Sequence, residues 1–152
     1  MRLELSLPLK VLSESKLDSS LKPKKERTSK YKIQISYVGT DFYGFQKQKK
    51  GPSIQACLET ALEVLLRHPV HIQGSSRTDS GVHAYQQVVV FSTSLAYSPR
   101  WIEGLNALTP RSIGIHLIEP IFDDFCPIRS SKAKIYRYQV WQGRCFDPFM
   151  AP

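Results

Sequence analysis

Apolar and polar residues alternate over residues 31–37, and this period of two is typical of a strand with one buried face. Over residues 54–66 the apolar spacing changes to three and four, which predicts an amphipathic helix. Ser53 is placed to cap the start of this helix, and Pro69 to stop it. The folded part of the chain is therefore expected to begin at Tyr31 with a strand followed by a helix.

The rest of the pattern predicts strands over residues 70–73 and 86–93, a short helix over 99–108, and strands over 113–118 and 132–141. The order β-α-β-β-α-β-β indicates an α+β domain with helices packed on one face of a mainly antiparallel sheet. This order fits both a split βαβ unit and an RNA-recognition-like sheet. The aromatic signature of RNA-recognition motifs is not found.

Residues 1–30 are rich in Ser, Lys and Leu, follow no sustained period, and contain a charge run over residues 22–27. Such a segment cannot bury enough apolar area to fold by itself. We therefore expect a disordered basic tail over residues 1–30 and a folded domain over residues 31–152. A solvated linker is favoured for the tail over a segment that contacts RNA phosphates.

The chain has 21 Lys and Arg residues against 13 Asp and Glu residues, a net charge of +8. Half of this excess lies outside the first 30 residues, so the folded part is basic without its tail. A basic domain favours a polyanionic partner, with nucleic acid first among the candidates. The hydrophobic content of 41% argues against a wholly disordered chain.

Three cysteines, Cys57, Cys126 and Cys145, form no CxxC pair, and the four histidines lack the spacing of metal ligands. Neither a disulfide framework nor a metal site is therefore expected. The sequence also shows no signal-peptide pattern and no apolar run near 20 residues. These features predict a cytoplasmic protein with no membrane segment.

Candidate chemistry centres on residues 74–84, which read Gly-Ser-Ser-Arg-Thr-Asp-Ser-Gly-Val-His-Ala. Asp79 lies two residues after Arg77, and a neighbouring guanidinium lowers the pKa of a carboxyl group. This pairing predicts an ionised, exposed carboxylate that can act as a nucleophile or a base. Taken alone, the Asp and Gly content favours an ordinary turn, because both residues are common turn formers.

The same run resembles the active-site motif G-x-G/S-R-T-D-x-G-V-H-A of the tRNA pseudouridine synthase A family. Four more stretches are similar to that family in the same order: residues 37–62 to Y-D-G-T-x-F-x-G-W-Q-x-Q…T-V-Q…L-E-x-A-L, 87–91 to Q-V-x-x-F, 105–110 to L-N-x-x-L-P, and 134–138 to K/R-x-Y-x-Y. The resemblance extends from Tyr31 to about Pro148 and covers about the first half of a family member.

This resemblance implies one half of a pseudouridine synthase fold, with the family's C-terminal half absent. It further implies isomerisation of uridine in the anticodon stem-loop of tRNA, no cofactor and no metal, and a homodimer. Asp79 matches the catalytic residue, which acts either as a nucleophile at C1′ or as a base on the sugar. Because the second half is absent, the alternative is a non-catalytic RNA-binding module or a remnant of such an enzyme.

Three more residues are implied as substrate-binding. Arg77 would orient Asp79, and its forked guanidinium can also hold a phosphate of the flipped nucleotide. Tyr136 matches a tyrosine that lies against the flipped base, although by pattern alone Tyr136 and Tyr138 are ordinary aromatics on one face of a strand. His83 either donates to a phosphate or fixes the backbone of its loop.

Tyr43 and Phe45 lie close in sequence to Lys47, Lys49 and Lys50. Aromatic rings mixed with positive charge in a loop are typical of an RNA-contacting rim. A solvated lysine run explains the same residues equally well.

Overall fold

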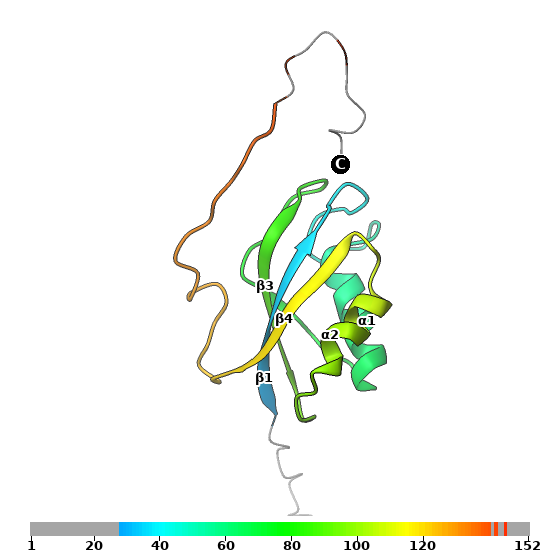
Figure 1. Ribbon diagram of the computed structural model, residues 1–152, viewed down its shortest axis with the longest axis vertical. Helices are drawn as coiled ribbons and strands as arrows, with labels where there is room; N and C mark the ends of the chain where they lie inside the picture. The colour runs from blue at the N-terminus through cyan, green and yellow to red at the C-terminus, as the bar shows by residue number, and fades with distance from the viewer. Residues whose placement is uncertain (1–27, 141, 143–144, 146–152) are drawn as a thin grey trace, which may run out of the picture.

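The computed structural model describes residues 28–140, 142 and 145, so residues 1–27, most of the predicted tail, lie outside the described residues. The described chain forms four strands and two helices in one small α+β domain (Figure 1). In chain order these are β1 (Ser29–Tyr37), α1 (Ile54–Leu66), β2 (Gln73–Gly74), β3 (Ala84–Thr93), α2 (Arg100–Leu108) and β4 (Ile113–Ile121).

The strands form an antiparallel sheet in the order β2-β3-β1-β4. β1 is central, and Ile33 lies opposite Val89 of β3 on one side and Ile118 of β4 on the other. α1 connects β1 to β2 with β3 between them, and α2 connects β3 to β4 with β1 between them. This is the split βαβ topology, in agreement with the α+β fold expected from the sequence.

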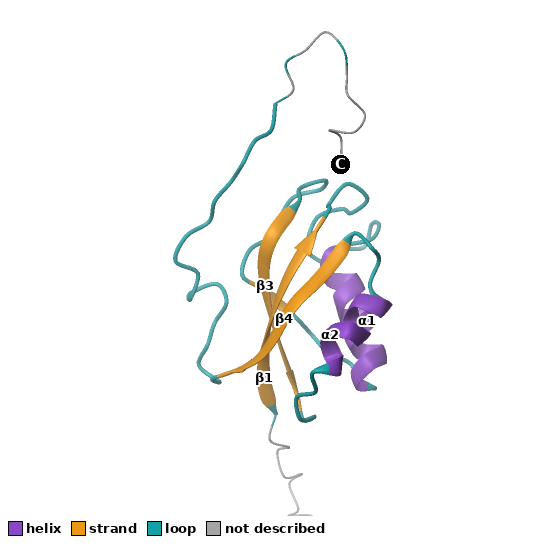
Figure 2. Ribbon diagram, viewed as in Figure 1, coloured by secondary structure: helices purple, strands orange, loops and turns teal. Residues whose placement is uncertain are grey.

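Both helices pack on the same face of the sheet (Figure 2). The strict alternation of β1 sets that face, because every second residue of the strand is buried against the helices. The core joins apolar side chains of the sheet to the apolar stripe of α1: Tyr31, Ile33, Ile35, Tyr37, Val89 and Phe91 from the sheet, with Ile54, Leu58, Ala61, Leu62 and Leu66 from the helix. The other face carries polar pairs such as Lys32 with Glu119.

The start of α1 is the one predicted from the sequence. Ser53 is its N-cap, and the Ser53 Oγ accepts a hydrogen bond of 3.3 Å from the Ala56 N–H. The helix ends before the predicted stop at Pro69, because Arg67 adopts the left-handed conformation at φ 60° and its N–H bonds the Glu63 carbonyl.

Two predicted strands differ from the structure. β2 is limited to Gln73–Gly74, although the prediction covered residues 70–73. Residues 132–140 of the strand predicted over 132–141 pair with no strand in the described part of the chain, and Figure 1 shows them running apart from the sheet; residue 141 lies outside the described residues. Lys30 Nζ donates to the carbonyls of Asp123 and Phe125, which holds the preceding turn near the start of β1. An alternating pattern of side chains does not form a strand unless another strand pairs with its backbone N–H and carbonyl groups.

Leu58 tests the packing of α1 on the sheet because it is fully buried in the core. We expect Leu58→Ala to lower the free energy of unfolding by about 2–5 kcal/mol, since it leaves a cavity between helix and sheet. Val64→Ala on the same helix is the matched control, because Val64 is 58% exposed and its truncation should change stability by less than about 0.5 kcal/mol. Urea unfolding followed by circular dichroism measures both, and equal losses would contradict the described packing.

Candidate functional site

Residues 75–83 connect β2 to β3 and carry Asp79, as the sequence predicted for a strand-to-strand connection. The Val82 N–H donates to the Asp79 carbonyl at 3.2 Å and closes a turn. Gly81, the third residue of this turn, has φ 79°, a value that type II turns require and that glycine adopts without strain. The turn leaves the Asp79 side chain exposed to solvent.

The loop between β1 and α1, residues 38–53, holds the Asp79 turn from both sides. The Phe45 N–H donates to the Thr78 carbonyl at 3.0 Å, one residue before Asp79. Two residues after Asp79, the Gly81 N–H donates to the Phe42 carbonyl at 3.3 Å. The backbone on each side of the carboxylate is therefore anchored to the same neighbouring loop.

Two glycines let these loops approach each other. A Cβ on Gly39 would lie 2.0 Å from the Val82 carbonyl oxygen, and a Cβ on Gly44 would lie 2.7 Å from the Thr78 carbonyl oxygen. Gly44 also has φ 85°, which disfavours any side chain. The contact between the loops is thus made backbone to backbone.

The N-terminus of α1 supports this arrangement. The first N–H groups of a helix have no partner inside it. Here the Ile54 N–H donates to the Gly44 carbonyl at 3.3 Å, and the Gln55 N–H donates to the Phe45 carbonyl at 2.9 Å. Because the Phe45 N–H bonds Thr78, one residue links α1 to the backbone beside Asp79.

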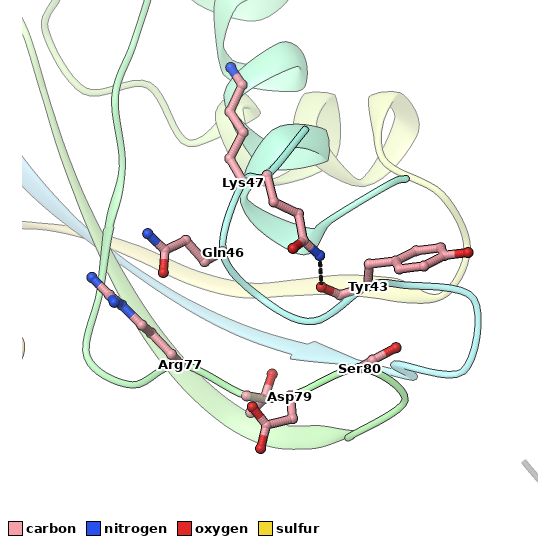
Figure 3. Close-up of a pocket in the computed structure, with 8 residues that line it drawn as sticks. Tyr43, Gln46, Lys47, Arg77, Asp79 and Ser80 are labelled. Carbon is pink, nitrogen blue, oxygen red and sulfur yellow. Dashed lines mark hydrogen bonds between the residues drawn. The ribbon is translucent and has the colours of Figure 1, made fainter. Parts of the chain in front are cut away.

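The two loops enclose a pocket of about 510 Å³ (Figure 3). Its lining combines one carboxylate, two cationic side chains, two amides, two hydroxyls and one phenol: Asp79, Arg77, Lys47, Gln46, Gln48, Thr78, Ser80 and Tyr43. Cationic and amide side chains suit the binding of a polar, anionic substrate. The single carboxylate among them, Asp79, is the group that can attack it.

Arg77 and Asp79 line the same pocket, but they do not pair. Figure 3 shows the guanidinium and the carboxylate pointing away from each other, and Asp79 has no ion pair among the described residues. The residue between them explains this, because Thr78 is held by its carbonyl and also by its Oγ1, 2.8 Å from the Tyr37 hydroxyl. The expectation that Arg77 orients Asp79 is therefore not met in this structure.

Burial raises the pKa of the Tyr37 hydroxyl, and the hydrogen bond with Thr78 only partly offsets this effect. Tyr37 therefore stays a neutral phenol over the physiological range. Its contribution to the site is to fix the Thr78 side chain from beneath the loop.

His83 fixes the loop backbone. The Gly39 N–H donates to His83 Nδ1 at 3.0 Å, which ties the two loops together at their bases, next to β1 and β3. An accepting Nδ1 places the ring proton of the neutral imidazole on Nε2. The exposed ring thus retains one N–H donor, Nε2–H, that pairs with no described residue.

Tyr136 is not part of the pocket in this structure. It lies within residues 131–140 with 69% of its surface exposed, and the residues that line the pocket come from the two loops alone. The structure therefore brings together Asp79 and Arg77 of the predicted site, places His83 at the base of the same loop, and leaves Tyr136 apart.

Of the residues interpreted as an RNA-contacting rim, Tyr43 and Lys47 line the pocket, whereas Phe45 is not at the surface. Phe45 is only 3% exposed, and a Cβ on Gly74 would lie 2.6 Å from its ring. Its ring packs beneath the loop, and its carbonyl accepts the hydrogen bond from the Gln55 N–H of α1.

Sequence reasoning did not assign Gln46, Gln48 or Ser80 to the site. Gln48 Nε2 donates to the Tyr43 carbonyl at 2.6 Å and so stiffens the wall opposite Asp79. Ser80 Oγ donates to the Phe42 carbonyl at 3.1 Å. The available signal was their position inside the two motif strings.

A buried polar network adjoins the pocket. Glu59 Oε1 accepts hydrogen bonds from Gln55 Nε2 at 3.0 Å and the Ile72 N–H at 3.3 Å, and lies 2.8 Å from His71 Nδ1. Glu59 Oε2 lies 3.3 Å from Lys47 Nζ. Burial acts to raise the pKa of the Glu59 carboxyl, but the bonds from Gln55, Ile72 and Lys47 and the charge of His71 outweigh it and hold this pKa below its ordinary value.

This lowered pKa predicts a loss of stability in acid. The stabilising contribution of Glu59 is fully present above the carboxyl pKa of the unfolded chain, about 4.3, and is lost as the pH falls through the lower pKa of the folded state. We expect the difference in unfolding free energy between wild type and Glu59→Gln to shrink between pH 6 and pH 3. Urea unfolding at several pH values measures it against Glu63→Gln, an exposed control on the same helix. A difference that stays constant with pH would contradict the prediction.

Within residues 28–140, 142 and 145, no group of three or more His, Cys, Asp or Glu side chains is placed to hold a metal ion. No helix in this part of the chain combines the length and the apolarity needed to cross a membrane.

Known proteins match the part of the chain that forms the sheet, the helices and the two loops. Residues 33–125 match the family described as tRNA pseudouridine synthase. The chain is 32% identical over 123 residues to the tRNA pseudouridine synthase A of Aquifex aeolicus. The aligned residues cover 80% of this chain and 51% of that protein.

Two further relatives with the same name show similar coverage. The protein of Thermodesulfovibrio yellowstonii is 40% identical over 76% of this chain and 44% of its own length. That of Staphylococcus carnosus is 38% identical over 78% of this chain and 45% of its own length. The chain thus spans about half the length of the curated relatives it matches.

Proposed function

Because the chain belongs to the tRNA pseudouridine synthase family, we propose that it isomerises uridine to pseudouridine in tRNA with Asp79 as its catalytic residue. The observation that carries the proposal is the turn that presents an exposed Asp79 carboxylate, without an ion pair among the described residues, in a pocket while the backbone on both sides is anchored. A fixed backbone and a free carboxylate are what an attacking group needs, because attack requires both a set position and an accessible lone pair.

The proposed reaction breaks the bond between N1 of uracil and C1′ of ribose, and forms a bond between C5 and C1′. The C5 proton leaves and N1 gains a proton, so no oxidant or activated donor is required. Asp79 acts either as a nucleophile at C1′ or as a base on the sugar. In both roles it must be ionised and reach a flipped nucleotide, which the exposed position of its side chain supports.

Three further residues take the binding roles. The Arg77 guanidinium, which does not pair with Asp79, is available for a backbone phosphate. His83 Nε2–H offers a second phosphate donor at the base of the loop. Tyr136 stacks on the flipped base only if residues 131–140 lie over the pocket when RNA is bound, a placement that differs from the one described above.

We propose the anticodon stem-loop of tRNA as the target, a homodimer as the assembly and the cytoplasm as the compartment. The motif resemblance supports the first two, and the absence of paired cysteine motifs supports a reducing compartment. The net charge of +8 supports binding to an RNA backbone.

The test is to incubate the purified chain with unmodified tRNA and to map pseudouridine after chemical labelling. A full-length relative such as the Aquifex aeolicus protein serves as the positive control, and protein-free tRNA as the negative control. We expect pseudouridine in the anticodon stem-loop. RNA binding that weakens with salt but yields no pseudouridine would reject the enzymatic proposal and favour the alternative, a non-catalytic RNA-binding module.

A further inference from the structure

A buried carboxylate on α1 joins segments of the chain that surround the pocket. Glu59 has only 10% of its side chain exposed, and it meets donors from Gln55, Lys47, His71 and Ile72. A carboxylate withdrawn from water to this extent is stable only when such donors replace the lost hydration. The chemistry proposed above makes no use of this side chain.

The first segment that Glu59 holds is the pocket wall. The Lys47 N–H donates to Gln55 Oε1 at 3.0 Å, and the Lys47 ammonium pairs with Glu59. In Figure 3 the Lys47 side chain points away from Asp79, and the Glu59 contact shows that it extends toward α1. Two residues earlier, Phe45 bonds the backbone beside Asp79, so the anchored wall is continuous with the catalytic turn.

The second segment is the approach to the Asp79 loop. The Ile72 N–H bonds Glu59, and the Ile72 carbonyl accepts a bond of 3.3 Å from Gln55 Nε2. β2 follows at once, but it contributes only two cross-strand pairs with β3. Two pairs make a short strand, since typical strands have five or six residues, and the Ser75 N–H extends the pairing by one bond of 2.8 Å to the Val88 carbonyl. The side chains of α1 therefore add a second anchor just before this short strand.

We propose that Glu59 is a positioning residue for the Asp79 pocket, tying the wall at residues 45–48 to the approach at residues 71–74 and so fixing the loop that carries Asp79. The effect of Glu59 on catalysis rests on the proposed function. Its role in fixing the Asp79 loop does not. A carboxylate suits this position because both of its oxygens accept, Oε1 from Gln55 and Ile72 and Oε2 from Lys47. A glutamine at this position has a single acceptor oxygen and turns an NH₂ group toward other donors.

Amide hydrogen exchange on the full chain tests the positioning directly. In Glu59→Gln we expect the exchange protection of the Lys47 and Ile72 amides to fall at least about tenfold. The loss should extend to Phe45 and Gly81, whose N–H groups hold the Asp79 turn, while the amides of β1 and β3 change less than about twofold. In Glu63→Gln, the exposed control on α1, all of these amides should keep their protection.

Two results would overturn the proposal. Unchanged protection at Phe45 and Gly81 would show that the Asp79 loop is held without Glu59. A uniform fall that includes β1 and β3 would show that Glu59 acts on the stability of the whole domain and not on the pocket. Neither result depends on the chain being an active enzyme.

Kinetics provide a second readout. If Glu59 positions Asp79, Glu59→Gln should lower kcat for pseudouridine formation about tenfold and leave KM for tRNA within about twofold, because RNA contacts are retained. A rise in KM with unchanged kcat would contradict positioning and indicate a binding role. If the wild-type chain forms no pseudouridine, the proposed function fails, and hydrogen exchange alone decides whether Glu59 fixes the loop.

Discussion

Replacement of Asp79 by asparagine is expected to lower the rate of pseudouridine formation by at least about 10³-fold. Asparagine keeps the size of the side chain but removes the negative charge, so it can neither attack C1′ nor accept a proton from the sugar. The backbone bonds at Thr78 and Gly81 that hold the turn do not involve the Asp79 side chain, so tRNA binding should stay within about twofold of wild type. Single-turnover assays with labelled tRNA and a filter-binding assay measure the two effects separately.

Asp41→Asn is the matched control for this substitution. Asp41 is an exposed carboxylate in the facing loop that does not line the pocket, so its replacement causes the same change in net charge near the site. We expect near wild-type activity for this variant. Pseudouridine at undiminished levels in Asp79→Asn, or an equal loss in Asp41→Asn, would remove Asp79 from the role proposed for it.

Gly39→Ala is expected to cause a large loss for a different reason. The added Cβ would lie 2.0 Å from the Val82 carbonyl oxygen, a backbone atom that cannot rotate away. The two loops must therefore separate, which also breaks the hydrogen bond from the Gly39 N–H to His83. We expect a loss of about 2–3 kcal/mol in the free energy of unfolding, measured in urea, together with a fall in activity.

Gly81→Ala separates this steric effect from backbone strain. Gly81 has φ 79°, but a Cβ there meets no atom within 4 Å, so only the strain of a positive φ is introduced. That cost is about 1 kcal/mol. Gly44→Ala combines a positive φ with a contact of 2.7 Å to Thr78 and should be at least as damaging as Gly39→Ala. Equal losses for Gly39→Ala and Gly81→Ala would show that the loops do not touch as described.

The elements that were predicted correctly are those encoded by local periodicity. β1 and α1 bury one face each, so the spacing of apolar residues along the chain states both the type of element and the face that packs. The Ser53 cap is equally local, since its Oγ bonds an N–H only three residues away. The position of Asp79 between two strands followed from the strand patterns at residues 70–73 and 86–93.

The errors concern contacts between distant segments. Residues 132–140 were predicted to form part of a strand, but a strand exists only where another strand accepts its backbone bonds. Arg77 and Asp79 are close in sequence, yet the bonds that Thr78 makes with Tyr37 and Phe45 set the direction of the chain between them. Phe45 was expected on the surface, and its burial depends on the backbone bonds that α1 makes with the loop.

The sequence by itself determined the α+β class, the buried faces of β1 and α1, the family, and Asp79 as the candidate carboxylate, because each depends on residue type and short-range spacing. Only the tertiary structure decided how that carboxylate is held. The loops that hold it lie about 40 residues apart in the chain, and they meet through backbone carbonyls of Phe42 and Thr78 and through glycines that leave room for them. Nearly every residue carries the same backbone N–H and carbonyl groups. The pattern of side chains therefore does not predict which carbonyl accepts a hydrogen bond from a distant N–H. The network around Glu59 follows the same rule, since a buried glutamate on a helix can be interpreted only when its donors from other segments are known.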